Sequence, residues 1–119
     1  MIDLHLTHIV PEDPYEAFRW AEKLFAERDY LGAVRILEHL LGQAPSQTGL
    51  LAARELLARS YFHSAQLGRA EETARVILGD HPDNSYAALL LTRALERQGR
   101  HDEAAETRKL AEALGALES

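Results

Sequence analysis

The sequence predicts an all-α fold of about six helices, arranged as a stack of three antiparallel helix hairpins. Small residues recur twelve positions apart, and in two of the three copies a proline follows twelve positions later. Loops of only two to six residues separate the expected helices, and such short loops join antiparallel neighbours. The three copies are Ala21, Ala33 and Pro45, then Ala58, Ala70 and Pro82, then Thr92 and Ala104 with no proline.

The first hairpin begins at a helix-start signal. Asp13 can accept hydrogen bonds from the free amides of a first turn, and Pro14 suits the first helical position. We expect one helix over about 14–27 and, after a tight turn, a second over about 30–42. Gly42 is expected to end the second helix in a left-handed cap, and the proline that follows prevents its continuation.

The second hairpin follows a polar stretch at 46–49, which opens a third helix that reaches about residue 64. Residues 66–68 are expected to turn the chain into a fourth helix over about 69–78. Gly79 and the second proline close this helix, so the glycines at 42, 68 and 79 are all interpreted as helix-end residues.

The third hairpin starts where one of residues 83–85 caps a fifth helix, which continues to Gln98. Residues 99–101 form the last turn. Asp102 is the expected cap of the sixth helix, which reaches about residue 117.

These spacings resemble those of the tetratricopeptide repeat family, in which small residues, an aliphatic residue and a proline recur at fixed intervals. The resemblance covers about residues 14–118, with copies 37 and then 34 residues apart. It implies a right-handed superhelical stack, a TPR-like α-solenoid, with repeats over about 14–47, 51–84 and 85–118. The matching residues include Trp20, Leu24 and Leu37 in the first copy, Leu57, Tyr61 and Ala74 in the second, and Leu91, Leu95 and Arg108 in the third.

The resemblance also implies a function, because the leading helix of each TPR hairpin lines a concave groove. The chain is then a protein-interaction adaptor that binds a peptide or helix of a partner protein. Aromatic residues and arginine, which interface hot spots favour, are frequent at the groove positions. The candidates are Tyr15, Phe18, Glu22 and Phe25 on the first helix, Glu55, Arg59, Phe62 and His63 on the third, and Tyr86, Leu89, Arg93, Glu96 and Arg97 on the fifth.

Other interpretations remain open. The aromatic residues can pack between neighbouring repeats, or lie beneath residues 1–12. The carboxylate-clamp subtype is not expected, because Phe18, Glu22 and Glu55 stand where that subtype needs lysine, arginine or asparagine. A second function is self-association, as a homodimer or higher assembly, through the groove, the repeat ends or the N-terminal segment.

Residues 1–12 differ from the rest of the chain. Ile2, Leu4 and Leu6 alternate with polar residues, a pattern typical of an extended segment. We expect the apolar side of this segment to lie on the helical body, or on a second copy, in preference to a frayed terminus.

Composition narrows the function further. A net charge of −6 argues against nucleic acid and against an anionic membrane surface, since both attract basic proteins. The absence of cysteine excludes disulfides and thiol catalysis and fits a cytoplasmic location. An excess of arginine over lysine suggests a GC-rich bacterial genome. The histidines are scattered and no catalytic set is visible, so we expect no metal, no cofactor and no enzymatic activity.

Overall fold

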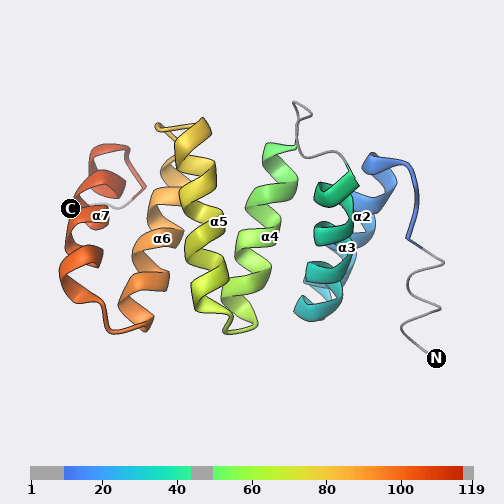
Figure 1. The fold of residues 1–119 in the computed structure, drawn as a ribbon, viewed down its shortest axis with the longest axis horizontal. Coiled ribbons are helices and arrows are strands. Elements are labelled where there is room, and N and C mark those ends of the chain that lie inside the picture. Colours follow the sequence, from blue (N-terminus) through green and yellow to red (C-terminus); the bar gives the residue numbers. More distant parts are fainter. Residues whose placement is uncertain (1–9, 44–49, 117–119) are drawn as a thin grey trace.

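The computed structural model describes residues 10–43 and 50–116, and within these ranges its regular structure is entirely helical. The described helices are α2 (Pro14–Ala26), α3 (Tyr30–Gln43), α4 (Leu51–His63), α5 (Leu67–Asp80), α6 (Ser85–Arg97) and α7 (His101–Ala113). They follow one another in chain order along the molecule (Figure 1). The predicted all-α stack of helix hairpins is therefore confirmed.

Three parts of the sequence interpretation fall wholly or partly outside the described residues. The first is residues 1–9 of the predicted N-terminal segment 1–12. The second is the loop 44–49, which contains Pro45 and the polar stretch 46–49. The third is the end of the last predicted repeat, beyond residue 116. No helix in the described ranges is both long enough and apolar enough to cross a membrane.

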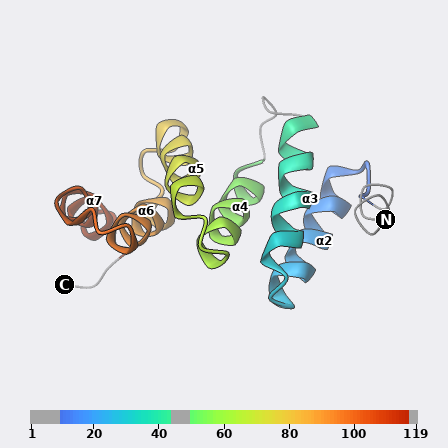
Figure 2. The same cartoon turned by 60° about the horizontal axis from the view of Figure 1, so that its bottom comes forward.

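The helices pack in a way that curves the stack. Each helix contacts the next in the chain, from α2 to α7. The backbones of the leading helices also approach one another, α2 with α4 and α4 with α6. In the described ranges the backbones of α3, α5 and α7 do not, and these helices meet only through long side chains. Figure 2 shows α5 above the line from α4 to α6. The leading helices therefore lie on the inner side of the curve.

Small residues occupy the places where paired helices cross, as predicted. Ala21, Ala33, Ala58 and Ala70 are fully buried, and Ala104 is 3% exposed. Larger side chains at these positions would force the helices of a hairpin apart.

Thr92 is the one polar member of this set, and it is also fully buried. Its hydroxyl donates to the carbonyl of Ala88 at 2.8 Å and lies 2.9 Å from the hydroxyl of Thr107 on α7. Because the buried hydroxyl is satisfied, threonine replaces alanine here without an unpaired polar group.

Each hairpin turns through one residue in the left-handed region. In every turn the next amide donates to a carbonyl five positions earlier at 2.8–3.0 Å, which is the hydrogen-bond pattern of a Schellman motif. The left-handed residues are Arg28 (φ 65°), Ala65 (φ 63°) and Gly99 (φ 77°). Only the third turn uses glycine, so the first two carry the steric cost of a side chain in this conformation.

The structure corrects the interpretation of three glycines in part. All three lie next to a helix end, as expected, but within the helix: Gly42 in α3, and Gly68 and Gly79 in α5, which runs from Leu67 to Asp80. None of these three has a positive φ. The two helices are longer than expected, because a glycine in a helical pattern costs only about 1 kcal/mol against alanine and does not by itself end a helix.

The caps agree with the sequence in two cases and differ in one. Asp13 accepts from the Tyr15 amide at 3.0 Å, and Asn84 accepts from the Ala87 amide at 2.8 Å. Asp102 is not a cap: α7 begins one residue earlier, at His101, after Arg100 in the cap position. Asp102 therefore lies in the first turn, where its carboxylate complements the helix dipole.

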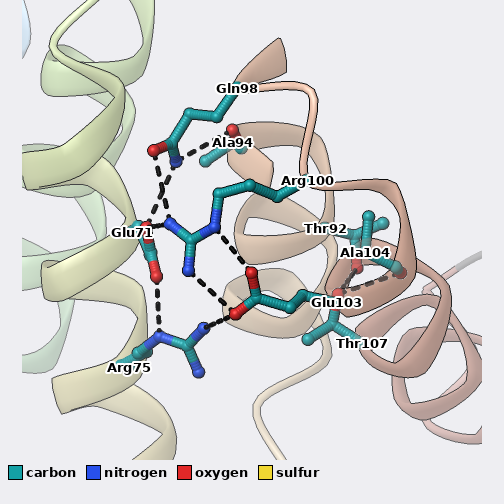
Figure 3. A network of polar contacts seen from close by, with 9 residues as sticks. All are labelled: Glu71, Arg75, Thr92, Ala94, Gln98, Arg100, Glu103, Ala104 and Thr107. Carbon is teal, nitrogen blue, oxygen red and sulfur yellow. Dashed lines mark hydrogen bonds and ion pairs between the residues drawn. The ribbon is translucent and has the colours of Figure 1, made fainter. Parts of the chain in front are cut away.

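A polar network joins α5 to the turn between α6 and α7 (Figure 3). The Glu71 carboxylate accepts from Arg100 at 2.5 Å, Arg75 at 3.1 Å and Gln98 at 3.2 Å. Arg100 also donates to both carboxylate oxygens of Glu103, at 2.7 and 2.8 Å. Burial opposes the ionisation of Glu71, but the hydrogen bonds from Gln98, Arg100 and Arg75 outweigh it and lower the pKa of this carboxyl.

Candidate binding groove

The repeat spacing arranges the inner surface in rows that cross α2, α4 and α6. Copies 37 and 34 residues apart make Glu22, Arg59 and Arg93 equivalent positions on the three leading helices. The row therefore changes from an acid on α2 to arginines on α4 and α6. This one row is polarised along the stack.

A hollow of about 280 Å³ lies at the centre of this inner surface. All three leading helices contribute to its wall, and most of the wall comes from α4. The lining residues are Phe18 and Glu22 from α2, Ala52, Glu55, Leu56 and Arg59 from α4, and Tyr86 from α6. The structure thus brings five of the predicted groove residues around one hollow.

Arg59 lies across the middle of the groove. Its guanidinium carbon is 4.6 Å from the ring centre of Phe25 on α2 and 5.8 Å from that of Tyr86 on α6. A guanidinium held over aromatic faces is oriented by those faces, and its N–H edges stay available for in-plane hydrogen bonds. Arg59 therefore presents a fixed donor group to the groove.

An aromatic cluster lies beside Arg59, at the ends of α2 and α4. The His63 ring stacks on Tyr30, with ring centres 5.0 Å apart, and meets Phe25 edge-on at 5.4 Å. Arg97 from α6 lies over Phe62, 5.1 Å from its ring centre. Burial, together with the charges of Arg59 and Arg97, lowers the pKa of His63.

Tyr30 was missed by the sequence interpretation, because it lies on α3 and not on a leading helix. The signal that could have revealed it is its position as the first residue after the turn, directly beside the end of α2. From there its ring reaches both Phe25 and His63.

Two of the three predicted groove carboxylates are engaged by other side chains. Glu55 accepts from the amide nitrogen of Asn84 at 2.8 Å, and Glu96 pairs with Arg108 of α7 at 2.6 Å. Across the described ranges, no carboxylate lies within ion-pairing distance of Arg59, Arg93 or Arg97. The groove arginines on α4 and α6 therefore have no partner in these ranges that neutralises them.

The groove aromatics differ in how far they reach into solvent. Phe18, Phe25, Phe62 and Tyr86 are half-buried and pack against the core, and Phe62 does so against two neighbouring clusters. These rings therefore pack against the core on one side, in line with one of the alternatives from the sequence. Tyr15, by contrast, is 64% exposed, and Leu89 is half-buried.

A second hollow, of about 300 Å³, lies on α3, α4 and α5 and was not predicted from the sequence. It lies over α4, where the backbones of α3 and α5 do not come close. Val76 of α5 is an exposed apolar residue at this hollow. The wall consists of Glu38, Leu41, Arg54, Leu57, Glu72, Thr73 and Val76.

Neither hollow has the residues of a metal centre. In the parts of the chain that the structure describes, no three histidine, aspartate or glutamate side chains come together as metal ligands would.

Comparison with known proteins identifies the fold. A point mutant of MamA superposes with a TM-score of 0.78 at 21% identity, covering 87% of this chain and 74% of that chain. MamA from AMB-1 gives 0.79 at 22% identity, covering 95% and 62%. The Sgt2 TPR domain from Aspergillus fumigatus gives 0.77 at 19% identity, covering 89% and 68%.

These structures share a helical solenoid of the TPR type with this chain, and at such low identity they establish the fold alone. The chain spans about three fifths of the AMB-1 protein. No protein-family model matches the sequence, and no curated protein matches it.

Proposed function

We propose that this chain is a non-enzymatic interaction module that binds a peptide or helix of a partner protein in the groove formed by α2, α4 and α6. The observation that carries the proposal is the hollow of about 280 Å³, whose wall comes from all three leading helices. A hollow built by several repeats is the surface on which a solenoid holds an extended ligand. Half-buried aromatic rings and oriented arginines beside it are the residue types of binding hot spots.

The proposal is also supported by what lies elsewhere on the surface. The exposed large apolar residues in the described ranges are Tyr15, Leu31, Val76 and Leu110, which lie on four different helices. Scattered single residues of this kind do not form the contiguous apolar patch that marks an interface. The groove is therefore a better candidate than the outer helix faces, which self-association through the repeat ends would require.

Ala52 offers a way to test the groove without removing any of its contacts. This residue is exposed, lines the hollow and lies in the first turn of α4. Ala52→Trp should fill the hollow while leaving the core intact. The matched control is Ala105→Trp, at an exposed alanine of α7 outside the groove.

The experiment is affinity capture from the source cell with the wild type and the two variants, with captured proteins identified by mass spectrometry. We expect the same partner with the wild type and Ala105→Trp, and its loss with Ala52→Trp at an unchanged melting temperature. Capture of that partner by Ala52→Trp at wild-type yield would refute the groove.

Self-association makes a different prediction in the same samples. Light scattering across a concentration series would then show a dimer or larger assembly as the dominant species, in place of a monomer that captures another protein.

A further inference from the structure

We propose that the occupant of the groove is an acidic segment of another protein, whose side-chain carboxylates bind Arg59, Arg93 and Arg97 and whose single bulky apolar side chain enters the central hollow. This inference rests on the proposed function and specifies the chemistry of the partner.

Two of the groove arginines lie over aromatic rings, and no carboxylate of the described ranges lies within ion-pairing distance of them. A guanidinium that has no carboxylate beside it and lies over an aromatic face keeps its N–H edges free, and this is the arrangement that accepts a carboxylate from outside. Arg59 over Phe25 and Arg97 over Phe62 both meet this description. Arg93 is exposed on the same inner surface.

The groove arginines differ from the four arginines on α5, on α7 and in the last turn. Arg69, Arg75, Arg100 and Arg108 each lie within 4.0 Å of a glutamate. A chain with 19 acidic and 13 basic residues has carboxylates to spare for its arginines. Three arginines without such a partner on one surface therefore leave a place for an acid supplied by a ligand.

The charge also differs between the two ends of the hollow. Glu22 lies on α2, and the arginines lie on α4 and α6. The glutamates of α4 and α6 in the groove, Glu55 and Glu96, are engaged by Asn84 and Arg108. An acidic segment would be repelled at the first end and attracted at the second. The carboxylates of the ligand should therefore lie over α4 and α6, with its apolar side chain between Phe18, Leu56 and Tyr86.

The donors are also spread over two helices, which distinguishes side-chain carboxylates from a chain terminus. A single terminal carboxylate needs one compact clamp. Arg59 and Arg97 lie on different helices and over different rings, an arrangement that suits separate carboxylates along a segment.

The test uses the whole protein and short fluorescein-labelled peptides, followed by fluorescence anisotropy. The main probe has both ends blocked and carries glutamates on either side of one leucine. The other probes replace every glutamate by lysine, replace every glutamate by glutamine while leaving the terminal carboxylate free, or are an oligothymidylate strand. The protein variants are Arg93→Gln and Arg97→Gln, with Arg69→Gln as the matched control on the outer surface.

We expect the blocked acidic peptide to bind and each groove variant to weaken it roughly tenfold, since each removes a charge-assisted contact. Arg69→Gln should bind like the wild type, and added salt should weaken binding. Binding of the lysine peptide, binding that requires a free terminus, or equal arginine-dependent binding of oligothymidylate would each overturn the inference. So would failure of the blocked acidic peptide to bind.

The two proposals fail separately. If Ala52→Trp abolishes capture of the cellular partner while Arg93→Gln and Arg97→Gln leave it intact, the groove binds a protein and the acidic chemistry is wrong. If Ala52→Trp has no effect on capture, the groove itself is not the site.

Discussion

The joint between the first and second hairpins and the joint between the second and third use equivalent positions with different chemistry. Val34 on α3 corresponds to Glu71 on α5, 37 residues later, and Gln66 corresponds to Arg100, 34 residues later. In the first joint Val34 is 6% exposed within the apolar core. In the second joint the same two positions hold a glutamate and an arginine, 2.5 Å apart.

The contrast extends to the outer edge of each joint, where an ion pair joins the two trailing helices. The acid is on the earlier helix in the first joint and on the later helix in the second. Glu38 on α3 faces Arg69 on α5 at 3.7 Å in the first joint. The equivalent residues of the second joint are Arg75 on α5 and Glu103 on α7, at 4.0 Å.

Glu38 also accepts a hydrogen bond from the hydroxyl of Tyr61. Burial, together with this bond, raises the pKa of Tyr61 to about 12. The equivalent of Tyr61 in the second joint is Leu95, which has no hydroxyl to donate.

One backbone geometry therefore tolerates two ways of joining repeats. The first joint lies in a large apolar cluster that includes Leu37, Leu41 and Leu57. The second has two smaller clusters, each with four buried apolar residues. Where less apolar surface is available, a network of charged side chains fixes the angle between repeats, because its hydrogen bonds are directional.

The largest expected effect comes from placing a glutamate, the equivalent of Glu71 in the second joint, at Val34 in the first joint. Val34→Glu buries a carboxylate with no arginine to receive it, and this should lower the free energy of unfolding by about 3 kcal/mol. Adding Gln66→Arg should recover a large part of the loss. Urea unfolding of the single and double variants measures both effects.

Val34→Gln is the control, since it introduces polarity without charge and Gln66→Arg should not rescue it. Unchanged stability of Val34→Glu would show that the first joint tolerates an acid and that the comparison is wrong.

A smaller effect is expected at Glu71. Its pKa is lowered in the folded chain, so its stabilising effect is present above the ordinary value of 4.5 and is lost as the pH falls through the folded pKa. Glu71→Gln should therefore reduce the free energy of unfolding by about 1.5 kcal/mol near neutral pH. The gap between the variant and the wild type should close in acid.

Denaturant titrations at a series of pH values test this prediction. The control is Glu72→Gln, at the exposed neighbour, which should give a curve parallel to the wild type. A gap that stays constant below pH 4.5 would contradict the ionised role of Glu71.

The smallest effect concerns the turns that lead into Gln66 and Arg100. Ala65 has a left-handed φ of 63°, as Gly99 does at 77°, so Ala65→Gly should stabilise the chain by about 0.5 kcal/mol. Gly99→Ala should destabilise it by about 1 kcal/mol. A Cβ at Gly99 would meet no atom within 4 Å, so the cost is conformational alone.

Thermal melts of a third variant distinguish the strain of a left-handed backbone from a steric clash of the added Cβ. Gly68→Ala is the matched variant, because a Cβ there also meets nothing within 4 Å but the backbone is helical. It should raise the melting temperature, whereas Gly99→Ala should lower it. A rise in both would refute the left-handed argument.

Much of the fold could be predicted from the sequence, because it depends on local spacing. The twelve-residue interval between Ala58 and Ala70 requires two helices that cross closely, and both residues are fully buried. Glycines were the weak point, since the same residue serves inside α5 at Gly68 and as a left-handed turn at Gly99. Composition alone does not distinguish these two uses.

The candidate groove could be predicted as a set of helix faces but not as a set of contacts. Periodicity placed Arg59 and Phe25 on the inner surface. Periodicity could not show that the Arg59 guanidinium lies over the Phe25 ring, because this contact depends on the angle between repeats and on side-chain rotamers. The same holds for Glu71 and Arg100, which are 29 residues apart in the chain.

The exchange of charges between the two joints has a consequence for the order of the hairpins. If the second hairpin were duplicated in tandem, Arg75 of one copy would face the Arg69 of the next. If the third hairpin directly followed the first, Glu38 would face Glu103. Like charges in such positions are unfavourable, so each shuffled order is penalised at the outer edge of the joint. The surface charges thus favour the existing order of the repeats, and a stack lengthened by copying its middle unit would carry two facing arginines at this edge, at the modest cost of an exposed pair.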